Sequence, residues 1–398
     1  MDLLAKSCQI NKERVFDNDD LNSIDSFIFL DGNKMKIRNN DVEYPFRQES
    51  NFFWLTGINK PDYQLAINCK KRKLIIIAPE CDENYLVWHG KYPDYQKMKQ
   101  NFGFDSIITE NESQNLEYYD REKNQELLLK TIESLRIIKN EYEIELMKNA
   151  CQLSQETHNF LIEKASSFID KNERNVEANF KFLTESQNDI TGQAYPPICA
   201  CGENSAILHY NDNNCIMKEG ELFLIDAGCE FLNYASDITR TYGIGEINKE
   251  KQKLIDIVTD INLQCKNKVR ENTHFREIHN KCMELVYQAI IDLKLVREDD
   301  NLTVDFLAPI FMPHGLGHFI GLDVHDVGGR LYNKKTNESK LLKENMVITI
   351  EPGIYFNKHL IEKHRDLWTD EMDKYKDIGG VRIEDDIVVK KDGYQQLN

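Results

Sequence analysis

The sequence predicts an α+β protein with two parts, a small N-terminal α/β domain over residues 1–135 and a larger domain over residues 136–398. Short apolar runs alternate with polar turns over residues 26–135, a pattern typical of strands. The largely polar stretch 111–130 carries no strand pattern and favours a boundary near 135. Amphipathic helices and further strands follow. We therefore expect the second domain to have helices that cover one face of a mixed sheet.

Length and composition are those of a globular protein. Of the 398 residues, 41% are hydrophobic and 29% charged, which excludes fibrous and disordered classes. The net charge of −17 would repel nucleic acid and anionic membranes. Because no apolar run approaches the ~18 residues of a membrane span and the N-terminus lacks a signal-peptide pattern, we expect a cytoplasmic protein. The ten cysteines include no C-x-x-C pair and are expected to be reduced, mostly buried thiols.

The individual elements follow from the period of the apolar residues. In the first part, strands are expected within residues 26–32, 63–80, 85–90 and 104–109. In the second part, apolar positions recur at helical spacing over residues 141–161, 254–265 and 278–290. Strand-like runs lie between and after these helices. They cover residues 221–226, 238–242, 346–351 and 381–389.

Two aspartates stand close to one predicted hairpin. Asp226 ends the apolar run LFLID, and Asp237 follows eleven residues later, after Gly228 and Asn233. A hairpin of that length can bring the two carboxylates side by side. Adjacent carboxylates repel and raise each other's pKa, so a bound cation would keep both ionised. Taken singly, each aspartate is more typical of a strand end or a solvated surface.

Histidines are concentrated in one short segment. His314 and His318 occupy PHGLGH, where two glycines permit a sharp backbone path, and His325 follows in LDVHDVGG. Imidazole is the commonest nitrogen ligand of transition metals and the usual proton carrier near neutral pH. A single histidine is more often a packed, hydrogen-bonded residue. Three within twelve positions favour a site.

Acidic residues also end the last two predicted strands. Glu351 follows MVITI and precedes Pro-Gly, so a strand end carries its carboxylate. In VRIEDDIVVK, a period of two places Arg382, Glu384 and Asp386 on one face. Buried acids need compensation that one arginine does not supply. The alternative for this segment is an edge strand with one face in water.

Together these segments supply four carboxylates and one histidine, with more imidazoles nearby. Oxygen ligands with one nitrogen suit a pair of divalent ions such as Mn²⁺, with Co²⁺ or Zn²⁺ as alternatives, better than a cysteine-rich structural zinc site. Two such ions can hold a hydroxide and polarise a scissile carbonyl. The sequence therefore predicts metal-assisted hydrolysis.

Six segments carry a family resemblance and lie in order over nearly the whole chain. They are FRQESNFFWLTG, GENSAILHY, LFLIDAGCEFLNYASDITRTY, FMPHGLGHFIGLDVHDVGG, VITIEPGIYF and GGVRIEDDIVV. With these motifs the chain resembles the pita-bread metallopeptidases, specifically the Xaa-Pro dipeptidase (prolidase) and aminopeptidase P group. The resemblance implies a pita-bread catalytic domain after a smaller N-terminal α/β domain of aminopeptidase P or prolidase type. It also implies a homodimer or a dimer of dimers.

The same resemblance assigns roles to residues of this chain. The two-metal centre of the family falls on Asp226, Asp237, His318, Glu351 and Glu384, all of which are present. Glu351 would also carry a proton from the bridging water to the leaving nitrogen. His209 and His325 would line the substrate site and stabilise the tetrahedral intermediate, and Arg382 would support it. The remaining residues with an implied place are Tyr195 and Thr239 beside the aspartates, His314 as a structural residue, and Trp88, which resembles a tryptophan that reaches a neighbouring subunit's active site.

The substrate class implied is a dipeptide or short peptide with proline in second position, with dipeptides slightly favoured. A tertiary amide lacks the N–H and has a fixed φ, so an apolar pocket can select proline. One departure weakens the dipeptide assignment. Prolidases carry an arginine just before the Met-Val strand that binds the free carboxylate of a dipeptide, whereas this chain has Arg330 and several lysines but no arginine close to Met346. Lysine is a poorer bidentate ligand for a carboxylate.

Three alternatives therefore remain at the level of the sequence. The first is an aminopeptidase P that acts on longer peptides. The second is a non-catalytic pita-bread module that binds a peptide or protein, although such modules typically lose metal ligands. The third is hydrolysis of a small amidino compound by a creatinase-like enzyme, a branch that works without the metals.

Overall fold

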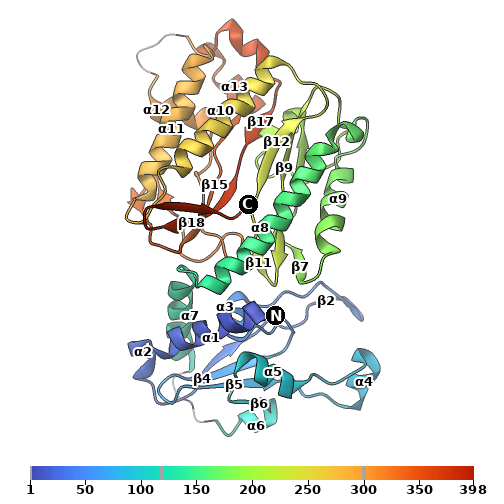
Figure 1. Cartoon of the computed structure of the whole chain (residues 1–398), viewed down its shortest axis with the longest axis vertical. Helices are drawn as coiled ribbons and strands as arrows, with labels where there is room; N and C mark the ends of the chain where they lie inside the picture. Colours follow the sequence, from blue (N-terminus) through green and yellow to red (C-terminus); the bar gives the residue numbers. More distant parts are fainter. Residues whose placement is uncertain (1, 117, 119–120, 298–301) are drawn as a thin grey trace. The chain divides into compact units, whose positions relative to one another are not determined.

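The computed structural model describes residues 2–116, 118, 121–297 and 302–398 (Figure 1). Internal contacts divide the chain into two compact units, Met1–Glu145 and Leu146–Asn398. The predicted domain boundary near residue 135 lies at the end of a helix within the first unit, and it stays a prediction. No helix in the described part of the chain is long and apolar enough to cross a membrane.

The first unit is built around one four-stranded sheet. Its strands are β1 (Ile28–Asp31), β4 (Gln64–Asn68), β5 (Lys73–Ala78) and β6 (Ser106–Thr109), and they lie in the order β1-β4-β5-β6. The first two pairings are antiparallel and the third is parallel. A small hairpin of β2 (Ile37–Asn39) and β3 (Val42–Glu43) lies outside this sheet. The helices are α1 (Asp2–Phe16), α2 (Asp19–Asn22), α3 (Ser50–Thr56), α4 (Glu83–His89), α5 (Tyr95–Phe102), α6 (Glu110–Ser113) and α7 (Arg121–Arg136).

The strand expected over residues 85–90 was predicted wrongly, because this segment is the helix α4. Asp82 caps its N-terminus by accepting the N–H of Tyr85 at 3.0 Å, and the N–H of Gly90 closes the last turn on Leu86. No residue of α4 is buried. The apolar run YLVW therefore lies on the surface, where a local cap decides the backbone conformation.

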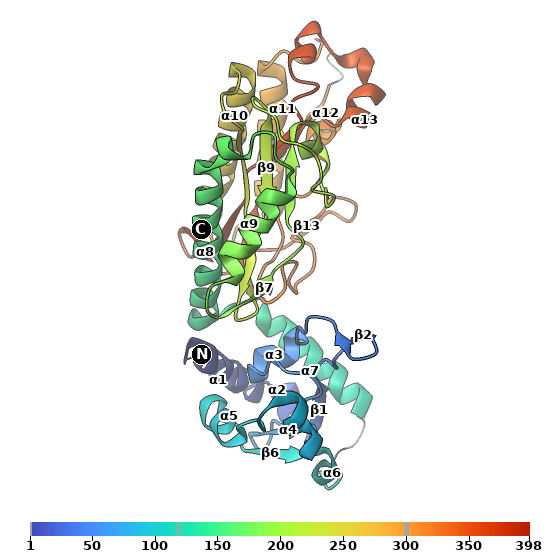
Figure 2. The ribbon, with the colours of Figure 1, turned by 90° about the vertical axis from the view of Figure 1, so that its right-hand side faces the viewer.

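The second unit consists of long helices and several short sheets. The predicted helices are confirmed as α8 (Glu141–Glu163), α10 (Lys249–Lys266) and α11 (Phe275–Asp292). Figures 1 and 2 show α8 and α10 along the same side of the sheet that contains β9. The other helices are α9 (Arg174–Glu185), α12 (Val304–Phe311) and α13 (Lys358–Lys363).

Two three-stranded sheets of this unit carry the chemistry described below. The first has the order β12-β9-β8, from β8 (Ile198–Cys201), β9 (Leu222–Asp226) and β12 (Thr239–Gly243). The second has the order β15-β18-β19, from β15 (Val347–Ile350), β18 (Asp385–Lys390) and β19 (Gly393–Gln396). The shorter strands are β7 (Ile190–Gln193), β10 (Cys229–Phe231), β11 (Tyr234–Ala235), β13 (Tyr332–Asn333), β14 (Glu338–Ser339), β16 (Gly353–Tyr355) and β17 (Gly380–Arg382).

The expected single mixed sheet of the second domain is not what the structure shows. Every strand pairing in the described part of Leu146–Asn398 is antiparallel, and the strands form separate short sheets. Short loops join β10 to β11, β13 to β14 and β18 to β19, and such connections produce antiparallel neighbours. The predicted strand 381–389 is also divided, into β17 and β18, with a break at residues 383–384.

A buried asparagine of α10 lies beside this break. The side-chain amide of Asn262, 2% exposed, donates to the carbonyl oxygen of Ile350 at 2.9 Å and to that of Ile383 at 3.1 Å. These two carbonyls directly precede Glu351 and Glu384. One side chain therefore fixes the backbone in front of both glutamates.

All ten cysteines are free thiols, and eight of them are buried. This confirms the expectation that most of the thiols are buried. Cys199 and Cys201 lie in β8 and pack in an apolar cluster with Phe180 and Phe223.

Candidate metal centre

The two aspartates stand at neighbouring ends of paired strands. Asp226 is the last residue of β9, opposite Thr239 of β12, and Asp237 lies two residues before Thr239. The chain between them forms the β10–β11 hairpin, whose turn residues Leu232 and Asn233 have φ of 47° and 66°. Both aspartates are buried, at 9% and 6% exposed. The hairpin expected from the sequence thus brings both carboxylates to one cavity.

Gly228 is required where this hairpin leaves β9. A Cβ atom at this position would lie 1.9 Å from the carbonyl oxygen of Ser236, so the two chains could not approach as they do. The N–H of Asp237 donates to the carboxylate of Asp386 at 2.8 Å, which fixes the backbone of the second aspartate.

His318 and Glu351 come from two chain segments that lie side by side. The N–H of Thr349 donates to the carbonyl of His318 at 2.9 Å, and the N–H of Glu351 donates to that of Leu316 at 2.9 Å. This pairing directs both side chains to the same place. The Nε2 atom of His318 lies 3.4 Å from Oδ2 of Asp237 and 3.6 Å from Oε1 of Glu351.

The close pairing depends on Gly317, and it gives a first testable prediction. A Cβ at Gly317 would lie 2.1 Å from the carbonyl oxygen of Thr349, whereas one at Gly315 would meet nothing within 4 Å. We expect Gly317→Ala to lower the free energy of unfolding by about 1–3 kcal/mol through overpacking and to displace His318. Gly315→Ala is the matched control. Thermal unfolding and peptide hydrolysis of both variants check this, and equal behaviour of the two would contradict it.

Glu384 occupies the break between β17 and β18. Its N–H donates to the carbonyl of Thr239 at 3.1 Å, and its Oε2 accepts the hydroxyl of Thr239 at 2.6 Å. The residue is 2% exposed. The period of two assumed for this segment therefore does not run through it: the break turns the carboxylate of Glu384 toward the aspartates, and Asp386 bonds instead behind Asp237.

Arg382 is the arginine that faces this group of acids. Its guanidinium forms an ion pair with Asp226 and donates to Tyr355 at 3.0 Å and to the hydroxyl of Thr239 at 3.1 Å. Burial alone would lower the pKa of Arg382, but the neighbouring Tyr355, Asp226 and Glu384 raise it well above its ordinary value. One cation cannot balance Asp226, Asp237, Glu351 and Glu384 together.

The pKa values of the acids show this imbalance. Burial raises the pKa of Glu351 to about 7, and it raises the pKa values of Asp226 and Glu384 as well. Burial alone would lower the pKa of His318, but its hydrogen bond with Asp237 and the charge of Glu351 raise it to about 9. The protein alone therefore holds this group partly protonated, and added positive charge would ionise it.

The donor atoms fit divalent cations. One ligand atom each from Asp237, His318 and Glu384 lie within 4.8 Å of one another. The Oδ1 atom of Asp226 is buried and has no hydrogen-bond partner among the described residues. Carboxylate oxygens with one imidazole nitrogen are ligands suited to divalent cations such as Mn²⁺, and the buried group lacks the positive charge they would supply.

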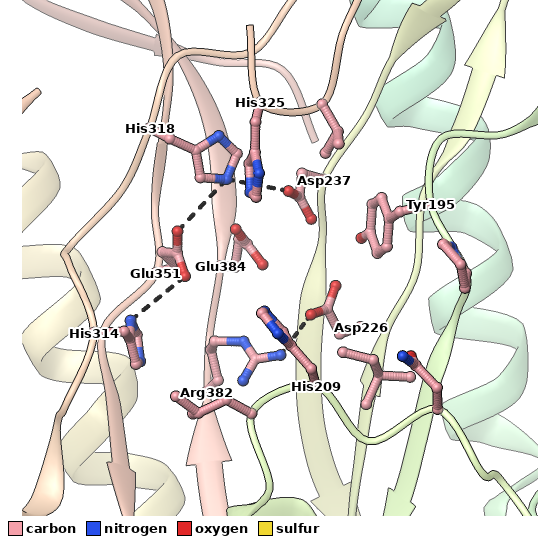
Figure 3. Close-up of a pocket in the computed structure, with 15 residues that line it drawn as sticks. Tyr195, His209, Asp226, Asp237, His314, His318, His325, Glu351, Arg382 and Glu384 are labelled. Atoms are coloured by element: carbon pink, nitrogen blue, oxygen red, sulfur yellow. Dashed lines mark hydrogen bonds and ion pairs between the residues drawn. The ribbon is translucent and has the colours of Figure 1, made fainter. Parts of the chain in front are cut away.

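The remaining predicted residues line the same cavity, which has a volume of about 260 Å³ (Figure 3). The ring of His325 lies 4.3 Å from that of His318, and His209 is exposed at the cavity. The hydroxyl of Tyr195 accepts the N–H of Ile238 at 3.4 Å. His314 contacts Tyr355 through Nε2 at 2.9 Å, and its Nδ1 lies 3.7 Å from Glu351. The cavity therefore contains the residues that the sequence singled out for the site, with two exceptions, Thr239 and Trp88. Thr239 does not line the cavity but donates its hydroxyl to Glu384.

Trp88 is the one residue with an implied catalytic place that lies outside this cavity. It belongs to α4 of the first unit and is 75% exposed. Its neighbours Leu86 and Val87 are exposed as well, at 38% and 79%.

Three residues that organise the site had no role assigned from the sequence, although Asp386 was placed beside Glu384. Tyr355 bridges His314 and Arg382, Asp386 accepts both the N–H of Asp237 and the thiol of Cys151, and Asn262 bonds in front of both glutamates. Tyr355 and Asp386 stand within the motifs EPGIYF and RIEDDIVV, so their proximity to site residues was a usable signal. Asn262 lies on a helix far from any motif and gave none.

A second cavity of about 750 Å³ adjoins the first. Both cavities are lined by His314, His318 and His325. The second one extends along Gly315–Phe319 toward Arg330, Tyr332 and Lys334, with Phe275, Met283 and Met312 as apolar walls. The region around the acids is therefore open to a molecule longer than the first cavity holds.

Comparison with known proteins identifies the family. Residues 145–391 match the model of metallopeptidase family M24, and residues 11–125 match the aminopeptidase P N-terminal domain. The chain belongs to metallopeptidase family M24. It is a hydrolase that acts on peptides with divalent metal ions, which confirms the predicted metallo-exopeptidase over a non-catalytic module.

Relatives of this M24 chain include fungal proteins named as probable Xaa-Pro aminopeptidases. The protein of Leptosphaeria maculans is 34% identical over 93% of this chain and 73% of its own length. That of Pyrenophora tritici-repentis is 32% identical over 93% of this chain and 88% of its own length. These names favour the aminopeptidase alternative over the dipeptidase that the sequence slightly favoured.

Solved structures confirm the pita-bread fold with its N-terminal domain. Aminopeptidase P from E. coli, with the inhibitor Pro-Leu, is 25% identical and has a TM-score of 0.80 over 99% of this chain and 94% of that one. The aminopeptidase from Pseudomonas aeruginosa is 25% identical with a TM-score of 0.81, again over 99% and 94%.

Proposed function

We propose that the protein is an Xaa-Pro aminopeptidase that removes the N-terminal residue from peptides longer than a dipeptide. The observation that carries this proposal is the second cavity, about 750 Å³, which continues from the acidic site past His314, His318 and His325. Pockets that bind ligands larger than a few atoms typically have volumes of 300–1,000 Å³, so a leaving peptide fits here. The fungal relatives support the same choice.

We propose that Asp226, Asp237, His318, Glu351 and Glu384 hold two divalent metal ions, with Mn²⁺ first and Co²⁺ or Zn²⁺ as alternatives. Bound ions of this kind polarise a scissile carbonyl and lower the pKa of water. The partly protonated state of the acids and the buried, unpartnered Oδ1 of Asp226 support this ligand set. Metal analysis of the purified enzyme, with reconstitution by each ion in turn, identifies the metal.

The other side chains of the cavity then take distinct parts in hydrolysis. Glu351 is placed to accept a proton from the attacking water and to release it to the leaving nitrogen, since its carboxylate reaches the cavity from β15. His209 and His325 donate to the oxygen on which negative charge develops. Arg382 holds Asp226 and Tyr355 and so supports the site without taking the proton.

A comparison of two peptides tests this function. With Mn²⁺ present, we expect a tripeptide Xaa-Pro-Yaa to be cleaved at least about tenfold more efficiently, in kcat/KM, than Gly-Pro. A chelator should abolish both reactions, and a tripeptide with alanine in place of proline is the control for proline selection. Cleavage confined to Gly-Pro would return the enzyme to the dipeptidase class. No cleavage of either peptide by the metal-loaded protein would refute the function altogether.

We further propose that the enzyme assembles as a homodimer or a dimer of dimers in which Trp88 reaches a neighbouring site. Its 75% exposure beside Leu86 and Val87 supports a role in contact with another molecule. Sedimentation of the protein measures the assembly. We expect Trp88→Ala to raise KM severalfold, and unchanged KM and turnover would count against this role.

We propose a cytoplasmic location. Ten free thiols, with no disulfide among them, favour a reducing compartment. Fractionation of cells that express the tagged protein tests this, and recovery from the medium or an oxidising compartment would refute it.

A further inference from the structure

Glu173, the residue directly before α9, is a buried carboxylate that the proposed mechanism does not use. It is 0% exposed. Within the described residues, the partners that its oxygens accept from are neutral groups. A buried carboxylate without a cation destabilises a fold unless hydrogen bonds compensate it. The groups that supply this compensation therefore indicate what the carboxylate holds in place.

All four donors to Glu173 come from one segment, residues 201–215. On Oε1 it accepts the N–H of Cys201 at 2.8 Å and the side-chain amide of Asn204 at 3.4 Å. On Oε2 it accepts the hydroxyl of Tyr210 at 2.8 Å and the N–H of Cys215 at 2.9 Å. One carboxylate thus joins the two ends and the middle of the segment.

The same segment carries His209, next to the buried Tyr210. His209 is exposed at the cavity and makes no side-chain hydrogen bond to any residue that the structure describes. The position of its imidazole is therefore set by its backbone. The neighbouring ring of Tyr210 points the other way, into the protein, where its hydroxyl meets Glu173.

On its other side the segment contacts β17, the strand that carries Arg382. The N–H of Gly380 donates to the hydroxyl of Ser205 at 2.7 Å. A Cβ at Gly379 would lie 2.0 Å from the carbonyl of Gly202, so no larger residue permits this approach. Segment 201–215 is therefore held by β17 on one side and by the carboxylate of Glu173 on the other. Of these two, only Glu173 bonds to Tyr210.

We propose that Glu173 is a positioning residue that places His209 in the active site, acting through Tyr210 and the two ends of segment 201–215. This inference rests on the proposed role of His209. Glu173 has no contact with the cavity itself and takes no part in the proton transfer.

A double-mutant cycle between Glu173→Gln and His209→Ala tests the inference. In Glu173→Gln an NH2 group replaces one carboxylate oxygen and faces groups that are themselves hydrogen-bond donors. The variant should therefore lower kcat/KM by at least about tenfold, mostly through kcat. Residues that act through one another have non-additive effects. We therefore expect Glu173→Gln to change the activity of His209→Ala by less than about twofold. Losses that multiply in the double variant would overturn the proposal.

Two further variants keep the test decisive. Tyr210→Phe removes one hydrogen-bond donor to Glu173 and leaves the fold intact. It should lower kcat/KM by less than Glu173→Gln does, and this loss should likewise disappear when His209 is already alanine. Glu185→Gln, at the exposed end of α9, is the matched control and should change nothing.

The imidazole signal of His209 in NMR spectra, assigned with His209→Ala, gives a readout without substrate. It should shift in Glu173→Gln and Tyr210→Phe but not in Glu185→Gln. An unchanged signal would overturn the proposal even if the enzyme proved to have another substrate.

Discussion

Replacing Glu351 by glutamine will lower kcat for an Xaa-Pro tripeptide by about 10²–10⁴-fold, the range that general acid–base catalysis contributes. Glutamine keeps the size of the side chain but cannot take up a proton. The carboxylate of Glu351 lies in the cavity beside His318 and His314, where no other described acid lies near both imidazoles. Steady-state kinetics with a saturating metal concentration measure the loss.

The control for this substitution is Glu344→Gln, which lies on the exposed turn before β15 and should retain full activity. Metal content, measured on the same samples, separates the two roles of Glu351. If the variant binds both ions and still loses activity, the loss belongs to proton transfer. A Glu351→Gln enzyme with more than about a tenth of the normal kcat would rule out this role for the carboxylate.

Removal of the metal ions will make thermal stability depend strongly on pH. At about 100 times the dissociation constant, one bound ion adds about 2.7 kcal/mol to the free energy of unfolding. For a domain of this size that corresponds to a rise in Tm of about 5–10 °C. We expect this full difference between metal-loaded and chelator-treated protein at pH 8, and a much smaller one at pH 5.

The direction of this pH dependence follows from the pKa shifts of the buried acids. Burial, above all, raises the pKa of Glu351 from its ordinary 4.5 to about 7 and raises that of Glu384 too. A group whose pKa is higher in the folded state stabilises below its unfolded pKa, and that contribution is lost as the pH rises through the folded pKa. The metal-free protein therefore weakens between about pH 4.5 and 7. Bound ions need the deprotonated ligands and act in the opposite direction.

Buried histidines elsewhere do not disturb this comparison. Burial lowers the pKa of His158 to about 3 and that of His279 to about 4, so their contribution is lost as the pH falls below 6.5. Both histidines are present with and without metal, so their effect on Tm cancels in the difference between metal-loaded and chelator-treated protein. A difference in Tm that is equal at pH 5 and pH 8 would show that the metals bind elsewhere.

Much of the candidate site followed from the sequence because its residues stand at ends of strands and in tight turns. Asp226 and Glu351 each end an apolar run, and a strand end fixes where the next side chain points. The glycines near His318 and Asp237 indicated sharp turns of the backbone, and at Gly317 and Gly228 a Cβ would also meet a backbone carbonyl. Such features are local, and a single chain displays them.

What the sequence could not supply depends on contacts between distant segments. The run 381–389 has the alternation of one strand, yet it breaks at residues 383–384, where the backbone bonds to Thr239 at the start of β12 and to the side chain of Asn262. The run 85–90 has strand composition, but no sheet edge receives it and the cap at Asp82 makes it a helix. Neither the period of the apolar residues nor the strand propensity of the sequence predicts these contacts.

The side-chain amide of Asn262 links α10 to the backbone in front of both glutamates. Because this one group bonds to the carbonyls in front of Glu351 and Glu384, the backbone positions of both glutamates depend on the position of α10. The β9–β12 hairpin, which carries the aspartates, is joined to Glu384 by a different residue, Thr239. A displacement of α10 would therefore reach the metal centre through the backbone of both glutamates at once.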